Sequence, residues 1–75
     1  MMEYEIVESK DWVKGAGCYP ARIVLLKIKK ASGRIEWSTH MEVNPTPDQK
    51  SNYMVQGHYF CDIFDAVNDF KNRKV

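Results

Sequence analysis

The sequence has few cysteines, few prolines and almost no net charge, and each scarcity excludes a class of protein. Its 75 residues include 2 cysteines, 3 prolines and 4 glycines, which excludes a disulfide-dense scaffold and a collagen-like or low-complexity chain. The formal net charge is +1, so no overall electrostatic attraction draws the chain to nucleic acid or to an anionic membrane. The longest apolar run, Ile23 to Leu26, is far short of the roughly 20 residues that span a bilayer.

The two cysteines, Cys18 and Cys61, allow at most one disulfide. The first residues, MMEYEIVESK, lack the basic start and apolar core of a secretory signal, and a single bridge is weak support for an oxidising compartment. We therefore expect both cysteines to be reduced, the protein to be cytoplasmic, and no membrane to be among its partners.

What the sequence does contain is the ordinary composition of a folded domain. Hydrophobic residues make up 44% and charged residues 28%, so disorder is not indicated. A chain of this length buries only about 60% of the surface that its unfolded form exposes, which leaves room for one sheet and one helix. Residues 1–75 are predicted to form a single domain.

Alternation of apolar and polar residues predicts the strands. It is strictest over 34–43, where Ile35, Trp37 and Met41 share one face with Thr39 and Val43, opposite a polar face. Prolines and glycines separate the other candidate segments. The predicted strands cover about 3–8, 21–30, 34–43 and 52–60.

The chain is predicted to end in a helix over about 62–72. Asp62 is a suitable N-cap, and the apolar residues Ile63, Ala66, Val67 and Phe70 recur with helical spacing. The predicted fold class is therefore α+β, β-β-β-β-α in order: a small antiparallel sheet of three to four strands with one C-terminal helix packed on one face.

The hairpin turn at 31–33 admits two registers. A two- or four-residue loop pairs Ile28 with Trp37 and gives one continuous apolar face, which is the register we prefer. A three-residue loop with Gly33 in a bulge would instead place Trp37 opposite Lys27. In the preferred register, Ile23 and Leu25 lie on the reverse face of the sheet beside His40.

This reverse face supplies the leading functional hypothesis. Either the loop over 10–20 folds over Ile23 and Leu25, or another chain does. Together with His40, and with Trp12 and Tyr19 of that loop, these residues are the candidate partner-binding residues. We expect a small non-catalytic protein-binding or regulatory module whose partner is a protein or a second copy, with a homodimer favoured.

Nucleic-acid binding is the alternative function. Basic residues gather at the end of the hairpin, and aromatic residues such as Trp12, Tyr19 and Tyr53 would offer stacking surfaces. Lysines on strands are also common at solvated edges, and the chain as a whole is nearly neutral. The candidate residues for this function are Lys27, Lys29, Lys30 and Arg34.

A metal- or thiol-dependent enzyme is the third and weakest hypothesis. His58 and Cys61 are ligand types that zinc prefers, with His40 and Cys18 as distant partners, but a structural zinc site usually has two close pairs of ligands. Cys61 as a nucleophile at the helix start would face Asp62 beside it, which opposes thiolate formation. We expect no catalysis and no cofactor.

Overall fold

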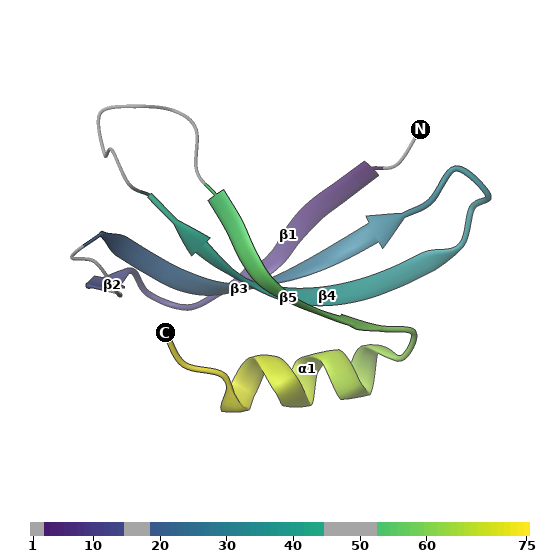
Figure 1. Cartoon of the computed structure of the whole chain (residues 1–75). Helices are drawn as coiled ribbons and strands as arrows, with labels where there is room; N and C mark the ends of the chain where they lie inside the picture. The colour runs from purple at the N-terminus through teal and green to yellow at the C-terminus, as the bar shows by residue number, and fades with distance from the viewer. Residues whose placement is uncertain (1–2, 15–18, 45–52) are drawn as a thin grey trace.

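The chain folds as an antiparallel sheet with one helix across one face (Figure 1). The computed structural model describes residues 3–14, 19–44 and 53–75. Within these residues the elements are β1 (Glu3–Ser9), β2 (Val13–Lys14), β3 (Pro20–Lys29), β4 (Ile35–Val43), β5 (Tyr53–Phe60) and α1 (Ile63–Asn72).

The strand order is β1-β3-β4-β5, so β1 and β5 form the two edges, and the short strand β2 also pairs with β3. The α+β class and the C-terminal helix are confirmed. β2 is an addition, because it lies in a segment expected to be a loop. Of the residues discussed above, Cys18 and part of the loop over 10–20 lie outside the described residues.

The preferred hairpin register is wrong, and the three-residue loop is the one that forms. Trp37 lies opposite Lys27, and Leu26 lies opposite Ser38. Gly33 decides this, because its φ of 88° is in the left-handed region, which glycine adopts without steric cost. Its amide donates to the Lys30 carbonyl at 2.8 Å, and the Lys30 amide donates to the carbonyl of Arg34 at 2.9 Å. This is the three-residue hairpin with glycine at its left-handed position.

The observed register exchanges the two faces of β3. Leu25 lies opposite Thr39, whose hydroxyl donates to Asp69 of α1, so Leu25 is on the face that α1 covers. Ile23 lies on the same face, and the two side chains are only 1% and 2% exposed. The expectation that they lie on the face away from the helix, covered by the loop over 10–20 or by another chain, is therefore wrong. We call this side the covered face.

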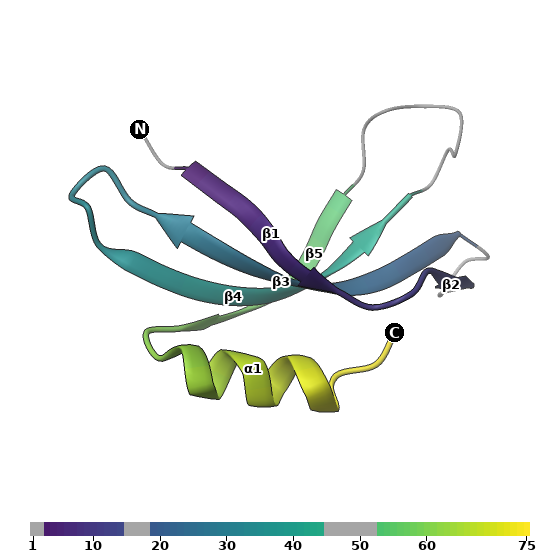
Figure 2. The same cartoon turned by 180° about the vertical axis from the view of Figure 1, so that it is seen from behind.

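The opposite side, which we call the open face, holds a second apolar cluster. Val24, Leu26 and Ile28 are buried there, with Met54 of β5 packed against them. Both ends of the sheet bend away from α1, so the open face is concave (Figure 2). A sheet with apolar residues on both faces allows a short chain to place two small cores on one central strand.

The helix is held at both ends by polar contacts. Asp62 caps its start by accepting the Phe64 amide at 2.8 Å, as predicted. At its end, the Lys10 ammonium donates to the Lys71 and Arg73 carbonyls at 3.1 and 2.6 Å, where the helix dipole favours a cation. Across the part of the chain that the structure describes, no helix has the length and apolar character needed to cross a membrane.

Candidate binding site on the open face

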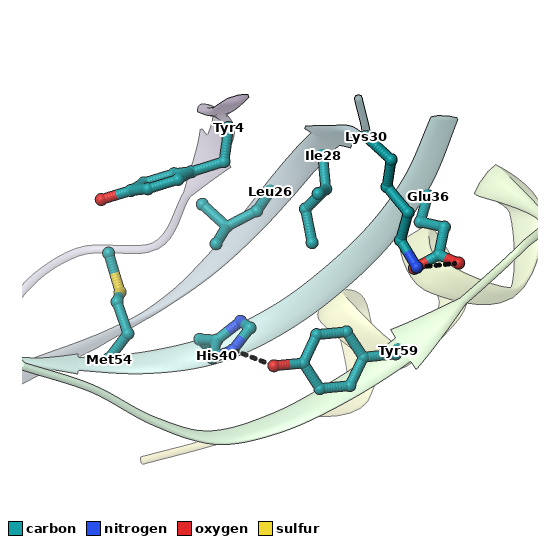
Figure 3. A pocket seen from close by; sticks show the side chains of 8 residues that line it. All are labelled: Tyr4, Leu26, Ile28, Lys30, Glu36, His40, Met54 and Tyr59. Atoms are coloured by element: carbon teal, nitrogen blue, oxygen red, sulfur yellow. Dashed lines mark hydrogen bonds and ion pairs between the residues drawn. The ribbon is translucent and has the colours of Figure 1, made fainter. Parts of the chain in front are cut away.

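A cavity of about 460 Å³ opens on the concave face of the sheet (Figure 3). Leu26 and Ile28 of β3 form its floor, and Met54 of β5 lies beside them. Tyr4 and Tyr59 stand at opposite ends of the cavity in Figure 3. The volume lies in the range of sites that take a small ligand or a group of side chains.

The two tyrosines come from the two edge strands. Tyr4 of β1 lies opposite Ile28, and Tyr59 of β5 lies opposite Ser38, so both project on the open face. Each is 64% exposed. An apolar floor between two exposed phenol rings gives a site that can bury carbon while its rim keeps hydrogen-bonding groups.

His40 is a buried polar residue beside this cavity. Its Nδ1 atom lies 3.2 Å from the Ser38 hydroxyl oxygen, and its Nε2 atom lies 3.3 Å from the Tyr59 hydroxyl oxygen. Burial lowers the pKa of His40, and the positive charges of Arg73 and His58 lower it further. In a neutral imidazole one nitrogen donates a hydrogen bond and the other accepts one. Each nitrogen of His40 thus has a hydroxyl group as its partner. The contact with Nε2 restrains the ring of Tyr59.

A bulge in β5 makes room for this ring. Between the pairs Thr39 with His58 and Met41 with Val55, two residues of β5, Gln56 and Gly57, occupy the stretch opposite His40. A Cβ atom added at Gly57 would lie 2.5 Å from Nε2 of His40. Glycine at this position is therefore what allows the imidazole to lie so close to β5.

The pairing of Ser38 with His40 does not resemble an activated nucleophile. Ser38 is 0% exposed, so its oxygen has no access to a substrate. A nucleophile and its base also need a donor pair to stabilise the developing oxyanion close by. Ser38 and His40 are better explained as a buried hydrogen-bonded pair that supports the cavity wall.

A second polar cluster holds α1 to the covered face. Asp69 of the helix accepts from the Thr39 hydroxyl at 2.5 Å and lies 3.1 Å from Nδ1 of His58. The Arg73 guanidinium donates to the Thr39 carbonyl at 2.9 Å and to the Gln56 carbonyl. His58 thus has a structural partner on the helix.

The acid dependence of folding should report on Asp69. Partial burial raises the pKa of this carboxyl, but hydrogen bonds from Thr39 and His58, with the charges of His58 and Arg73, outweigh it and hold the pKa below its usual value of 3.8. A lowered folded-state pKa stabilises the fold above pH 3.8 and loses that contribution as the pH falls through the folded-state pKa. Asp69→Asn should therefore destabilise the protein at pH 7 by about 1–3 kcal/mol.

The measurement is urea unfolding of wild type and Asp69→Asn at pH 7 and again near pH 3. The difference between the two proteins should shrink in acid, because wild type is losing the carboxylate that the variant lacks. Asp65→Asn, an exposed residue of the same helix, serves as the control. A difference that stays constant between the two pH values contradicts the role given to the Asp69 carboxylate.

The structure brings only one of the five predicted partner-binding residues to the cavity. His40 lines it, whereas Ile23 and Leu25 are buried under α1. Trp12 and Tyr19 are exposed but do not line the cavity, and the Arg22 guanidinium stacks over the Trp12 ring at 4.6 Å. The residues that sequence reasoning missed are Tyr4, Met54 and Tyr59. Strand alternation placed each on a strand face, but the strand order was needed to bring them together.

The basic residues of the hairpin have acidic neighbours. The Lys30 ammonium lies 3.0 Å from a Glu36 carboxylate oxygen. Lys27 pairs in register with Glu5, and Lys29 pairs with Glu3. These carboxylates reduce the positive potential that phosphate binding would use. Arg34 lies apart, with a guanidinium nitrogen 3.6 Å from the Cys61 sulfur.

The metal candidates His58 and Cys61 have separate partners, Asp69 and Arg34 respectively. Among residues 3–14, 19–44 and 53–75, no group of three His, Cys, Asp or Glu side chains is arranged to hold a metal ion. Comparison with known proteins found no matching family model, no matching curated protein and no matching solved structure.

Proposed function

We propose that this protein is a small non-catalytic protein-binding module whose open face receives the partner. The observation that carries the proposal is the apolar cavity of about 460 Å³ between Tyr4 and Tyr59. Tyrosine is enriched in protein interfaces, because its ring buries carbon and its hydroxyl keeps a hydrogen-bond partner. The contact between the Tyr59 hydroxyl and Nε2 of His40 restrains the ring, which lowers the entropy that binding would cost.

The shape of the site favours a protein partner. The apolar surface continues beyond the cavity, because Ile6 of β1 is 41% exposed and lies on the same face, opposite Leu26. A partner that buries these apolar side chains would contact a surface broader than the cavity itself. Such an apolar centre with a polar rim is the usual anatomy of a protein interface.

The proposal is tested with tagged protein incubated in a lysate of the cells that express it. Two variants are compared with wild type: Tyr4→Glu at the cavity, and Tyr53→Glu as a matched control. Tyr53 also lies on an edge strand, is 61% exposed and does not line the cavity. We expect wild type and the control to retain the same protein and Tyr4→Glu to lose it.

The retained protein is then purified and titrated against all three. Loss of a rim aromatic should weaken binding at least about tenfold, the size of a moderate interface contact. Equal affinity of wild type and Tyr4→Glu would contradict the proposal, as would a wild type that retains no protein at all.

A further inference from the structure

Phe64 is the most exposed large hydrophobic residue among those the structure describes. It is the second residue of α1 and is 81% exposed. It lies outside the apolar stripe of Ala66 and Phe70, so the packing of α1 on the sheet does not account for it. Its exposed ring offers a large apolar area that an interface can bury.

The open face has the complementary shape. It is a concave apolar surface, with a cavity that its own side chains leave unfilled (Figures 1 and 3). Two concave faces cannot pack against each other without trapping the void, and interfaces pack at the density of protein interiors. The occupant must therefore be convex and apolar.

We propose that Phe64 of one copy inserts into the open-face cavity of a second copy. This inference rests on the proposed function, since it uses the same face, and it names the partner as the chain itself. The aromatic ring of Phe64 would lie between Tyr4 and Tyr59 and above Leu26 and Ile28, where edge-to-face ring contacts are available. The mode is a helix laid in an apolar groove.

The dimensions and charges of the two surfaces agree. The cavity of about 460 Å³ lies in the range of pockets that bury a small molecule, so it has room for one aromatic ring. Beside Phe64 the helix start carries two carboxylates, Asp62 and Asp65, and Lys71 follows two turns on. The cavity rim carries Lys30 and Glu36, one charge of each sign. The rim therefore has no net negative charge to repel the acidic helix start.

The arrangement determines the kind of assembly. Phe64 belongs to α1, which packs on the covered face, and the cavity lies on the open face, so the two surfaces of one copy point in different directions (Figure 1). The contact is therefore heterologous, head to tail, and continues into a chain or a ring. The copy at each end of the chain keeps one free surface until the assembly closes.

Sedimentation of the purified chain over a wide concentration range tests this inference. The interface is small, so self-association is expected in the micromolar range or weaker, and concentrations up to about 1 mM are needed. Wild type should increase in mean mass with concentration beyond that of a dimer. Phe64→Glu and Tyr4→Glu should each weaken association at least about tenfold. Phe64→Met, which keeps an apolar side chain but loses the ring, should weaken association less than Phe64→Glu does, and Tyr53→Glu should behave like wild type.

A mixture of the two defective variants gives the decisive result. Phe64→Glu retains an intact cavity and Tyr4→Glu retains an intact Phe64, so an equimolar mixture should form a dimer and nothing larger. Circular dichroism of each variant first establishes that it is folded. A mixture that stays monomeric overturns the inference, and so does a wild type that is monomeric at every concentration.

The outcome also separates this inference from the proposed function. If wild type is monomeric but still binds a purified partner that Tyr4→Glu does not bind, the open face is a binding face and its occupant is a different protein. If Tyr4→Glu loses neither association nor partner, both proposals fail.

Discussion

Leu25→Glu should leave the protein unfolded at 25 °C. Leu25 is 2% exposed beneath α1, and replacing it removes a buried aliphatic side chain and places a carboxylate on the covered face. Loss of the buried leucine contacts alone costs about 2–5 kcal/mol, and an unpaired buried charge adds several more. A domain of this size has a total stability of about 4–11 kcal/mol, so the two costs together consume most or all of it.

Far-UV circular dichroism and urea unfolding measure the effect. The matched control is Ile6→Glu on the open face of β1, where the side chain is 41% exposed and the new carboxylate can stay in water. The control should keep the signal of a folded protein and lose about 1 kcal/mol or less. A Leu25→Glu variant with the unfolding midpoint of wild type would show that this side chain is not under the helix.

Much of the fold could be predicted from local patterns in the sequence. The alternation over 34–43 marks β4, which extends over Ile35–Val43. The N-cap residue Asp62 marks the start of α1. These signals depend on neighbours in the sequence, because a strand face and a helix cap are set by residues within a few positions.

The hairpin register could not be predicted from apolar continuity. Apolar continuity requires apolar residues opposite Leu26 and Val24 across the strand pair. The structure pairs them with Ser38 and His40, both of which are buried, because hydrogen bonds satisfy their polar atoms. The backbone conformation of Gly33 determined the register instead, and a shift of one residue moves every side chain to the other face.

The candidate site was recognised only in part for the same reason. With the wrong register, Ile23 and Leu25 were expected on the face away from the helix, where the structure places the cavity floor residues Leu26 and Ile28. Tyr4 and Tyr59 lie 55 positions apart in the sequence and meet at one cavity only because β1 and β5 flank the central strands. Strand order is a long-range property that alternation within single strands does not contain.

Gly57→Ala should destabilise the protein by about 1–3 kcal/mol, the usual cost of overpacking. The added Cβ would lie 2.5 Å from Nε2 of His40, which is closer than atoms in contact allow. The imidazole must move, and it then leaves its positions next to the Ser38 and Tyr59 hydroxyls. Backbone strain at residue 57 does not contribute to this cost. Among the glycines that the structure describes, the positive φ belongs to Gly33 and not to Gly57.

The effect of Gly57→Ala should change sign when the imidazole is removed. In a His40→Ala background the space beside Gly57 is vacant, and alanine then restricts the unfolded chain, which stabilises by about 0.4–1 kcal/mol. Urea unfolding of wild type, both single variants and the double variant gives the coupling between the two positions as a double-mutant cycle. If the changes in the free energy of unfolding of the two single variants add up to that of the double variant, the contact between the two positions is contradicted. Because the Tyr59 hydroxyl lies 3.3 Å from Nε2 of His40, Gly57→Ala should also weaken the proposed partner binding at the open face, although residue 57 itself does not line the cavity.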